Sequence, residues 1–201
     1  MAPPVYRLLH GVLLGLLAAA AGADGDATNK VDTCIVGAGA GGLQLAQLLL
    51  NAGRDFVLLE REAEAGSFYS RFPVHRRLIS LNKRNTGRDN AEFNMRHDWN
   101  SLLGSDVPRM TTRTKERWPH ADTLVEYLHE FAAPIAAAGK LLYGSDVLRI
   151  ERLPPAADGA VGLLELTVAQ RAPASGDADS SLRRLVCTVI AMAHGLGVPN
   201  K

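Results

Sequence analysis

Short hydrophobic runs alternate with glycine-rich and polar stretches in the first part of the chain. Residues 31–36 form an apolar run typical of a buried strand. Residues 43–50 carry leucine and alanine at spacings that predict a buried helix, ending at Asn51-Ala52-Gly53. Residues 56–59 predict a second buried strand, which Glu60 follows. This order predicts a parallel β-α-β unit of about 30 residues with a right-handed crossover.

Regular periodicity is lost between Gly66 and Lys115, where Arg, Asn, His and aromatic residues accumulate. This composition favours a long irregular region that lines a site, and a disordered linker is the alternative. Large apolar side chains argue against the linker. They are Phe68, Tyr69, Phe72, Leu78, Ile79, Leu81, Phe93, Met95 and Trp99.

The last third of the chain regains a clear pattern. Asp122 is predicted to cap an amphipathic helix that continues through Ile135 and ends at Gly139. Three strands are predicted at residues 147–153, 163–169 and 185–192, with a polar loop at 173–181. They indicate a small antiparallel sheet whose last strand is apolar enough to enter the parallel sheet. The expected fold class is therefore α/β, a Rossmann-type domain with an antiparallel excursion.

The N-terminus is predicted to be a secretory signal peptide over residues 1–23. Arg7 precedes an apolar run, and Ala21-Gly22-Ala23 matches a cleavage site. A transmembrane anchor is the alternative, but the run is shorter than the roughly 20 residues needed to span a bilayer. Residues 24–30 are small and polar and predict a linker. We therefore expect entry into the secretory pathway and no stable membrane anchor.

Charge and cysteine content narrow the function further. The 22 basic and 21 acidic residues are mixed along the chain and give a net charge of +1, so no strong field favours nucleic acid. Cys34 and Cys187 fall in predicted strands, where two separate core thiols are favoured over a bridge. No C-x-x-C pair is present, which argues against dithiol chemistry in this segment. No metal site is predicted.

The residues Gly37-Ala38-Gly39-Ala40-Gly41-Gly42 match G-x-G-x-x-G between the first strand and helix. Gly37 permits the tight turn, Gly39 lets a pyrophosphate approach the backbone, and Gly42 lets the helix pack closely on the sheet. Glu60 ends the next strand, where a carboxylate accepts hydrogen bonds from ribose hydroxyls. These features predict dinucleotide binding, with a purely structural glycine turn as the alternative. The predicted cofactor residues are Gly37, Gly39, Ala40, Gly41, Gly42, Glu60, Arg61, Ser67, Phe68, Asn82 and Gly195.

The downstream layout resembles the FAD domain of flavin-containing monooxygenases and related flavoprotein oxidoreductases. Three segments resemble one family more closely, the endoplasmic-reticulum flavoproteins associated with degradation. They are residues 77–87, 90–94 and 96–103. Two positions depart from the monooxygenase pattern, because Gly66-Ser67-Phe68 replaces Gly-Gly-Trp and Ala193-His194-Gly195 replaces Ala-Thr-Gly.

The resemblance implies an FAD-dependent oxidoreductase of the endoplasmic-reticulum lumen, linked to disposal of misfolded glycoproteins. Implied partners are reductases of the protein disulfide isomerase type and lectin-like degradation adaptors. NADPH would be the second cofactor of a longer protein, so residues 31–201 are expected to form an incomplete FAD-binding domain. A quality-control scaffold with structural FAD and a small-molecule monooxygenase are the alternatives.

Residues in the irregular region offer weaker candidates for chemistry. By the resemblance, Asn82 corresponds to an asparagine near the reactive face of the flavin, and a loop-stabilising role is the alternative. His97 and Asp98 could form an acid/base pair, although a structural role is favoured. Trp99 could stack on a flavin, although core packing is favoured. Arg71, His75, Arg76 and Arg77 could bind phosphate but are interpreted as a solvated loop face.

Overall fold

A six-stranded mixed sheet organises the part of the chain that the computed structural model describes, residues 29–154, 162–171 and 181–195. Its strand order is β3-β2-β1-β6-β5-β4. The strands are β1 (Asn29–Val36), β2 (Phe56–Leu59), β3 (Leu141–Leu142), β4 (Ser145–Arg152), β5 (Leu164–Gln170) and β6 (Ser181–Met192). The predicted loop at 173–181 lies largely, and the signal peptide entirely, outside these residues.

The parallel half of the sheet confirms the predicted β-α-β unit. β1 pairs in parallel with β2, in the register that sets Val36 beside Leu59, and helix α1 (Ala40–Asn51) connects the two strands. β3 extends this half beside β2 and was not predicted, because two residues are too few to show a periodic pattern.

The predicted antiparallel strands are confirmed, and they continue the parallel sheet through a shared strand. β6 pairs with β5 along residues 181–187 and with β1 along residues 185–192, so one long strand belongs to both halves. The prediction that the last strand enters the parallel sheet is confirmed. A twelve-residue strand has the length to serve two neighbours, and this makes the sheet continuous.

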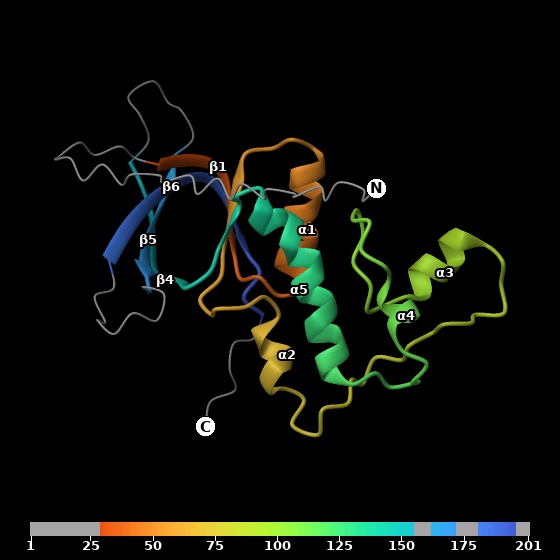
Figure 1. Ribbon diagram of the computed structural model, residues 1–201. Coiled ribbons are helices and arrows are strands. Elements are labelled where there is room, and N and C mark those ends of the chain that lie inside the picture. The colour runs from red at the N-terminus through yellow and green to blue at the C-terminus, as the bar shows by residue number, and fades with distance from the viewer. Residues whose placement is uncertain (1–28, 155–161, 172–180, 196–201) are drawn as a thin grey trace, which may run out of the picture.

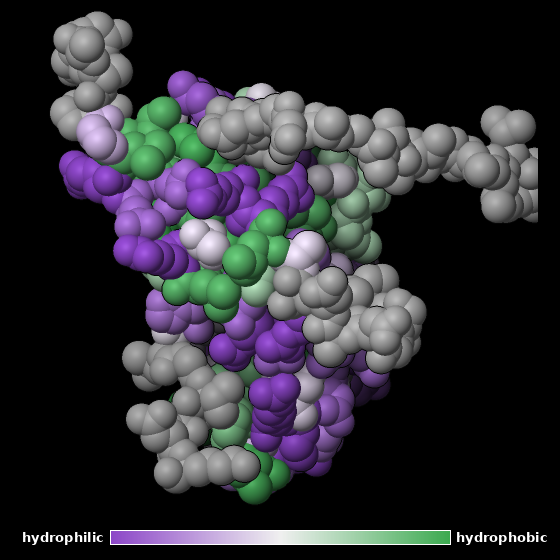
Figure 2. All heavy atoms as spheres, turned by 90° about the vertical axis from the view of Figure 1, so that its left-hand side faces the viewer, coloured by the Kyte–Doolittle hydropathy of each residue, from purple (hydrophilic) through white to green (hydrophobic). Residues whose placement is uncertain are grey.

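Apolar clusters cover both faces of the parallel strands. On one face, α1 and helix α5 (Ala121–Ala137) pack side by side against the sheet (Figure 1). On the other face, Leu166 and Val168 of β5 pack with Val57 and Leu59 of β2. The antiparallel arm, made of β4, β5 and residues 181–187 of β6, therefore folds over the sheet. Figure 2 looks onto this side of the molecule and shows apolar patches separated by hydrophilic ones.

Local capping at α5 differs from the prediction. His120, not Asp122, is the N-cap residue, and its ring nitrogen Nδ1 accepts a hydrogen bond from the Asp122 backbone amide at 3.3 Å. Asp122 lies in the first turn, where its negative carboxylate interacts favourably with the positive end of the helix dipole. The predicted end of the helix near Gly139 is confirmed, since Gly139 adopts a φ of +68° just beyond it.

The irregular region between Gly66 and Lys115 is confirmed as largely non-repetitive, with three short helices inside it. These are α2 (Ser67–Arg71), α3 (Ala91–His97) and α4 (Met110–Arg113). The prediction that Trp99 packs in the core is wrong, because its side chain is 65% exposed and the Lys83 ammonium lies 3.8 Å from its ring centroid.

Cys34 and Cys187 form a disulfide, which corrects the expectation of two separate thiols. Their Cα atoms lie 6.0 Å apart because β1 and β6, 153 residues apart in sequence, become direct neighbours. Both side chains are fully buried in the cluster beneath the antiparallel arm. The prediction that both residues occupy buried strands is confirmed.

None of the helices in the described ranges is both long and apolar enough to cross a membrane.

Candidate functional site

A cavity of about 1070 Å³ opens where the parallel strands end. Val36, Leu59 and Met192 line it at the carboxyl ends of β1, β2 and β6, and α2 and β4 form further walls. Ligands of open α/β sheets bind at this edge. The cavity brings together most of the predicted cofactor residues, namely Gly37, Gly39, Ala40, Gly41, Glu60, Arg61, Ser67, Phe68 and Gly195.

The glycine loop has the geometry expected of its sequence. Gly37 adopts a φ of +103°, and a Cβ atom there would lie 2.8 Å from the Ala193 carbonyl oxygen. A Cβ atom on Gly42 would lie 1.9 Å from the Gly37 carbonyl oxygen, so only glycine permits this contact of helix and turn. Around Gly39 and Gly41 no atom lies within 4 Å of a built Cβ, so these two positions face open space.

The N-terminus of α1 is open toward the cavity. Gly39 is the N-cap residue, no side chain caps this end of the helix, and its first turn holds no acidic residue. The first amides of a helix lack intrahelical partners and carry partial positive charge. This end of α1 therefore suits an anionic group such as a phosphate.

The Glu60 carboxylate fixes the glycine loop as well as facing the cavity. One oxygen accepts a hydrogen bond from the Ala38 amide at 2.7 Å, and the other accepts one from the Glu62 amide at 2.9 Å. The side chain is buried. Each carboxylate oxygen offers about two acceptor sites, so both oxygens retain capacity for a ligand hydroxyl.

Tyr143 lies close to this acidic end of β2. Burial raises the pKa of its hydroxyl, and the charges of Glu60 and Glu64 raise it further. The hydroxyl therefore stays protonated and neutral at physiological pH.

Aromatic and charged side chains form a further part of the cavity wall. The rings of Phe68 and Phe72 stack with centroids 5.2 Å apart, and both side chains line the cavity. The Glu62 carboxylate lies within 3.6 Å of Arg61 and within 3.5 Å of Arg71, which are also lining residues. This end of the cavity is thus both apolar and ionic.

Several lining residues were missed by sequence reasoning. They are Glu62, Tyr69, Phe72, Ser145 to Ile150, and Met192 to His194. Arg71, interpreted from the sequence as part of a solvated loop face, lines the cavity as well. β4 reaches the cavity only because the antiparallel arm folds back toward β1 and β2. No local sequence pattern predicts that contact.

Asn82 and Gly42 are the two predicted residues that do not line the cavity. Asn82 is buried, and its amide Nδ2 donates to the Thr114 carbonyl at 2.8 Å. Its Oδ1 has no partner among the described residues. This placement favours the loop-stabilising role, and contact with a flavin stays a prediction.

His97 and Asp98 bond to separate partners, not to each other. The His97 ring nitrogen Nδ1 lies 2.7 Å from the Phe93 carbonyl oxygen, and the ring stacks on Phe93. Asp98 accepts hydrogen bonds from the Ser101 amide and the Thr111 hydroxyl. This arrangement supports the structural role for both residues.

Comparison with known proteins identifies relatives over most of the chain. "FAD-dependent oxidoreductase domain-containing protein 2" of Mus musculus is 41% identical over 172 residues, which cover 84% of this chain and 24% of the relative. The protein of the same name from Danio rerio is 44% identical over 150 residues, which cover 73% and 21%. The chain thus spans about a quarter of the length of these relatives.

Solved structures show the same fold at low sequence identity. A polycyclic ketone monooxygenase from Thermothelomyces thermophila gives a TM-score of 0.58 at 19% identity, covering 87% of this chain and 24% of that chain. The OTEMO complex with FAD and NADP gives a TM-score of 0.56 at 16% identity, covering 87% and 27%. Both similarities confirm the predicted α/β fold class.

A family match covers the glycine loop, the irregular region and α5. Residues 34–138 match the family described as pyridine nucleotide-disulphide oxidoreductase. The relatives named above agree with the resemblance drawn from residues 77–103. The chain therefore belongs to the pyridine nucleotide-disulphide oxidoreductase family, and its curated relatives are FAD-dependent oxidoreductases.

Proposed function

We propose that this chain is the FAD-binding part of an oxidoreductase of the endoplasmic-reticulum lumen. The observation that carries the proposal is the cavity bounded by the glycine loop, the open N-terminus of α1 and Glu60. The names of the relatives support FAD as the ligand.

The residues present fit FAD in three respects. Open space at Gly39 and Gly41 leaves room for a pyrophosphate against the backbone. The α1 amides supply donors for the phosphate oxygens, and Glu60 keeps acceptor capacity for ribose hydroxyls. The cavity volume of about 1070 Å³ lies at the upper end of ligand pockets.

The chain's own residues bind and orient the cofactor in this proposal. Bound FAD supplies the electron transfer, which no side chain in the cavity provides. The glycine loop holds the pyrophosphate, Glu60 holds the adenosine ribose, and the Phe68 and Phe72 rings form an apolar wall that excludes water.

NADPH as electron donor and a role in degradation of misfolded glycoproteins extend the proposal to the whole protein. NADP is present in the OTEMO complex, a fold neighbour of this chain. The sequence holds one G-x-G-x-x-G fingerprint, so NADPH would bind outside these 201 residues. Disulfide isomerase-type reductases and lectin-like adaptors are the proposed partners.

Residence in the secretory pathway agrees with a structural feature that is independent of the N-terminus. The Cys34–Cys187 disulfide joins two core strands, and such bonds persist chiefly in oxidising compartments. A reporter fused to residues 1–23 should be exported and cleaved after Ala23. A cytosolic or membrane-anchored reporter would contradict this part of the proposal.

Binding of FAD is the central test. The full-length protein should carry FAD with 1:1 stoichiometry, and NAD⁺ should not displace it. Residues 24–201 alone, as an incomplete FAD-binding domain, should bind FAD weakly, and NADPH added without oxygen should leave that flavin oxidised. A folded full-length protein that binds no FAD would refute the proposed site, and prompt bleaching of tightly bound flavin in residues 24–201 alone would refute the separate NADPH site.

A further inference from the structure

Helix α2 forms a wall of the cofactor cavity and is only weakly anchored in the core, against which the half-buried Tyr69 packs. It has five residues, Ser67–Arg71, and none of its side chains is buried. A helix this short is unstable alone, because it gains few hydrogen bonds for the backbone order that it requires. Contacts at its two ends therefore add to the packing of Tyr69 in fixing its position.

The N-terminal end of α2 is fixed to the glycine loop and to α5. The Gly66 amide donates to the Ala38 carbonyl at 2.9 Å. A Cβ atom on Gly66 would lie 2.7 Å from a Leu128 methyl group, so this end sits directly on α5.

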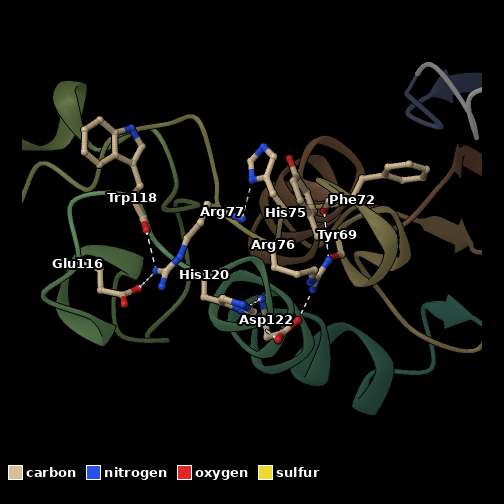
Figure 3. Close-up of polar contacts among 9 residues, drawn as sticks. All are labelled: Tyr69, Phe72, His75, Arg76, Arg77, Glu116, Trp118, His120 and Asp122. Atoms are coloured by element: carbon tan, nitrogen blue, oxygen red, sulfur yellow. Dashed lines mark hydrogen bonds and ion pairs between the residues drawn. The ribbon is translucent and has the colours of Figure 1, made fainter.

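The C-terminal end of α2 is fixed by the Arg76 guanidinium. Its Nη1 donates to the Tyr69 carbonyl and, at 3.5 Å, to the Phe72 carbonyl, while Nη2 pairs with the Asp122 carboxylate (Figure 3). The positive charge at these carbonyls also interacts favourably with the negative end of the helix dipole. One side chain thus joins α2 to the first turn of α5.

Surrounding groups keep this link charged and in place. The hydrogen bond from Arg76 lowers the pKa of Asp122, and the charges of Arg76 and His120 lower it further, so the carboxylate is ionised at neutral pH. The Arg76 carbonyl accepts a hydrogen bond from the Ala121 amide at 2.9 Å, which attaches the backbone to α5 as well. The sequence-based interpretation of Arg76 as a solvated residue is therefore wrong, since its side chain is only 24% exposed.

The backbone of Arg76 gives a second, independent observation. Its φ is +58°, the one positive value among non-glycine residues in the described ranges. Glycine or asparagine adopts this conformation more readily than arginine. An arginine side chain at a position that favours glycine indicates that the guanidinium has a function there.

Arg77 lies beside Arg76 and points the other way. Its guanidinium pairs with Glu116 at 2.5 Å and donates to the Trp118 carbonyl at 3.3 Å, away from α2 (Figure 3). The side chains of Arg77 and Glu116 are each about half exposed. Arg77 thus serves as a matched arginine that does not line the cavity and whose guanidinium bonds to Glu116 and Trp118 instead of α2.

We propose that Arg76 is a positioning residue for the cofactor cavity, holding α2 so that Phe68 and Phe72 face the bound ligand. This inference rests on the proposed FAD function. It assigns to Arg76 an effect on cofactor affinity that acts through α2, without contact between the guanidinium and the cofactor.

The test compares Arg76→Gly, Arg76→Lys and Arg77→Ala in the full chain, by FAD fluorescence titration and thermal unfolding. Arg76→Gly relieves the backbone conformation while it removes the guanidinium, so the melting temperature should change little. FAD affinity should nevertheless fall by about tenfold, the effect of losing one charge-assisted link. Arg76→Lys should recover part of the affinity, and Arg77→Ala should stay within about twofold of the unmodified chain.

Two further outcomes decide the inference. FAD affinity that is equal in Arg76→Gly, Arg77→Ala and the unmodified chain would overturn it. An affinity loss that only follows a loss of folded protein would overturn it too. If Arg76→Gly does not fold, Asp122→Asn replaces it, because this variant weakens the same ion pair while it keeps Arg76. If the folded, unmodified full-length protein binds no FAD, the proposed function fails instead, so the two failures are distinguishable.

Discussion

Gly39 and Gly42 lie three residues apart in the same loop and have opposite surroundings. A side chain on Gly39 would enter open space, whereas one on Gly42 would collide with the Gly37 carbonyl. The glycine fingerprint therefore contains one position reserved for a ligand and one reserved for the fold.

Gly39→Val should abolish FAD binding while leaving stability nearly unchanged, because its branched side chain would occupy only ligand space. Gly42→Ala should lower the free energy of unfolding by about 3 kcal/mol or prevent folding, since the backbone must shift to admit a methyl group. Urea unfolding and FAD titration of both variants separate the two effects. A Gly39→Val protein with unchanged FAD affinity would refute the assignment of the loop.

Glu60→Ala should lower both FAD affinity and stability. The sequence predicts loss of one ribose contact with the phosphate loop intact, but Glu60 also accepts the Ala38 and Glu62 amides. Leaving these donors without partners costs about 1–3 kcal/mol of unfolding free energy. Amide hydrogen exchange at Ala38 should accelerate relative to the unmodified protein, and unchanged protection there would contradict this role.

The elements differ in how well local sequence predicts them. β1, α1 and β2 follow directly from hydrophobic runs and a glycine turn, because each buries its own apolar side chains. α2 buries none of its side chains and depends on Gly66 and Arg76, so no periodic signal marks it. The His120 cap was missed because Asp122 is the stronger capping residue by type, while the backbone starts the helix one residue after His120.

The antiparallel arm should contribute to stability through its inward face. Leu166→Ala removes a fully buried side chain beneath β5 and should lower the free energy of unfolding by about 2–4 kcal/mol. Leu182→Ala, at a β6 position that is 67% exposed, is the matched control and should change it by under about 0.5 kcal/mol. Equal effects of the two variants in urea unfolding would mean that the arm does not pack on the sheet.

At the scale of the whole molecule, the site divides into a predictable and an unpredictable half. The glycine loop and Glu60 belong to one contiguous β-α-β unit, so their spacing in the sequence predicts that they lie close together in the fold. Ser145 to Ile150 join them only through the path of the complete sheet. The disulfide was missed for the same reason, because the adjacency of β1 and β6 is a property of topology and leaves no local signal.

Non-reducing peptide mapping should recover Cys34 and Cys187 in one linked pair. The double variant Cys34→Ala, Cys187→Ala should lose roughly 2–5 kcal/mol of unfolding free energy, because the bond closes a loop of 153 residues in the unfolded chain. Reductant should destabilise the unmodified protein and leave the double variant unaffected. Recovery of two free thiols from the folded protein under non-reducing conditions would contradict the bond.

The pairing of β1 with β6 determines when the sheet can be completed during biosynthesis. At roughly 5–20 residues per second, the 153 residues between Cys34 and Cys187 take about 8–30 s to emerge. Throughout that interval β1 can pair with β2 but lacks its other neighbour, and Gly37 lacks the Ala193 segment against which it turns. Cofactor binding therefore follows the emergence of β6 and Ala193, and until then one edge of β1 stays exposed without its partner strand.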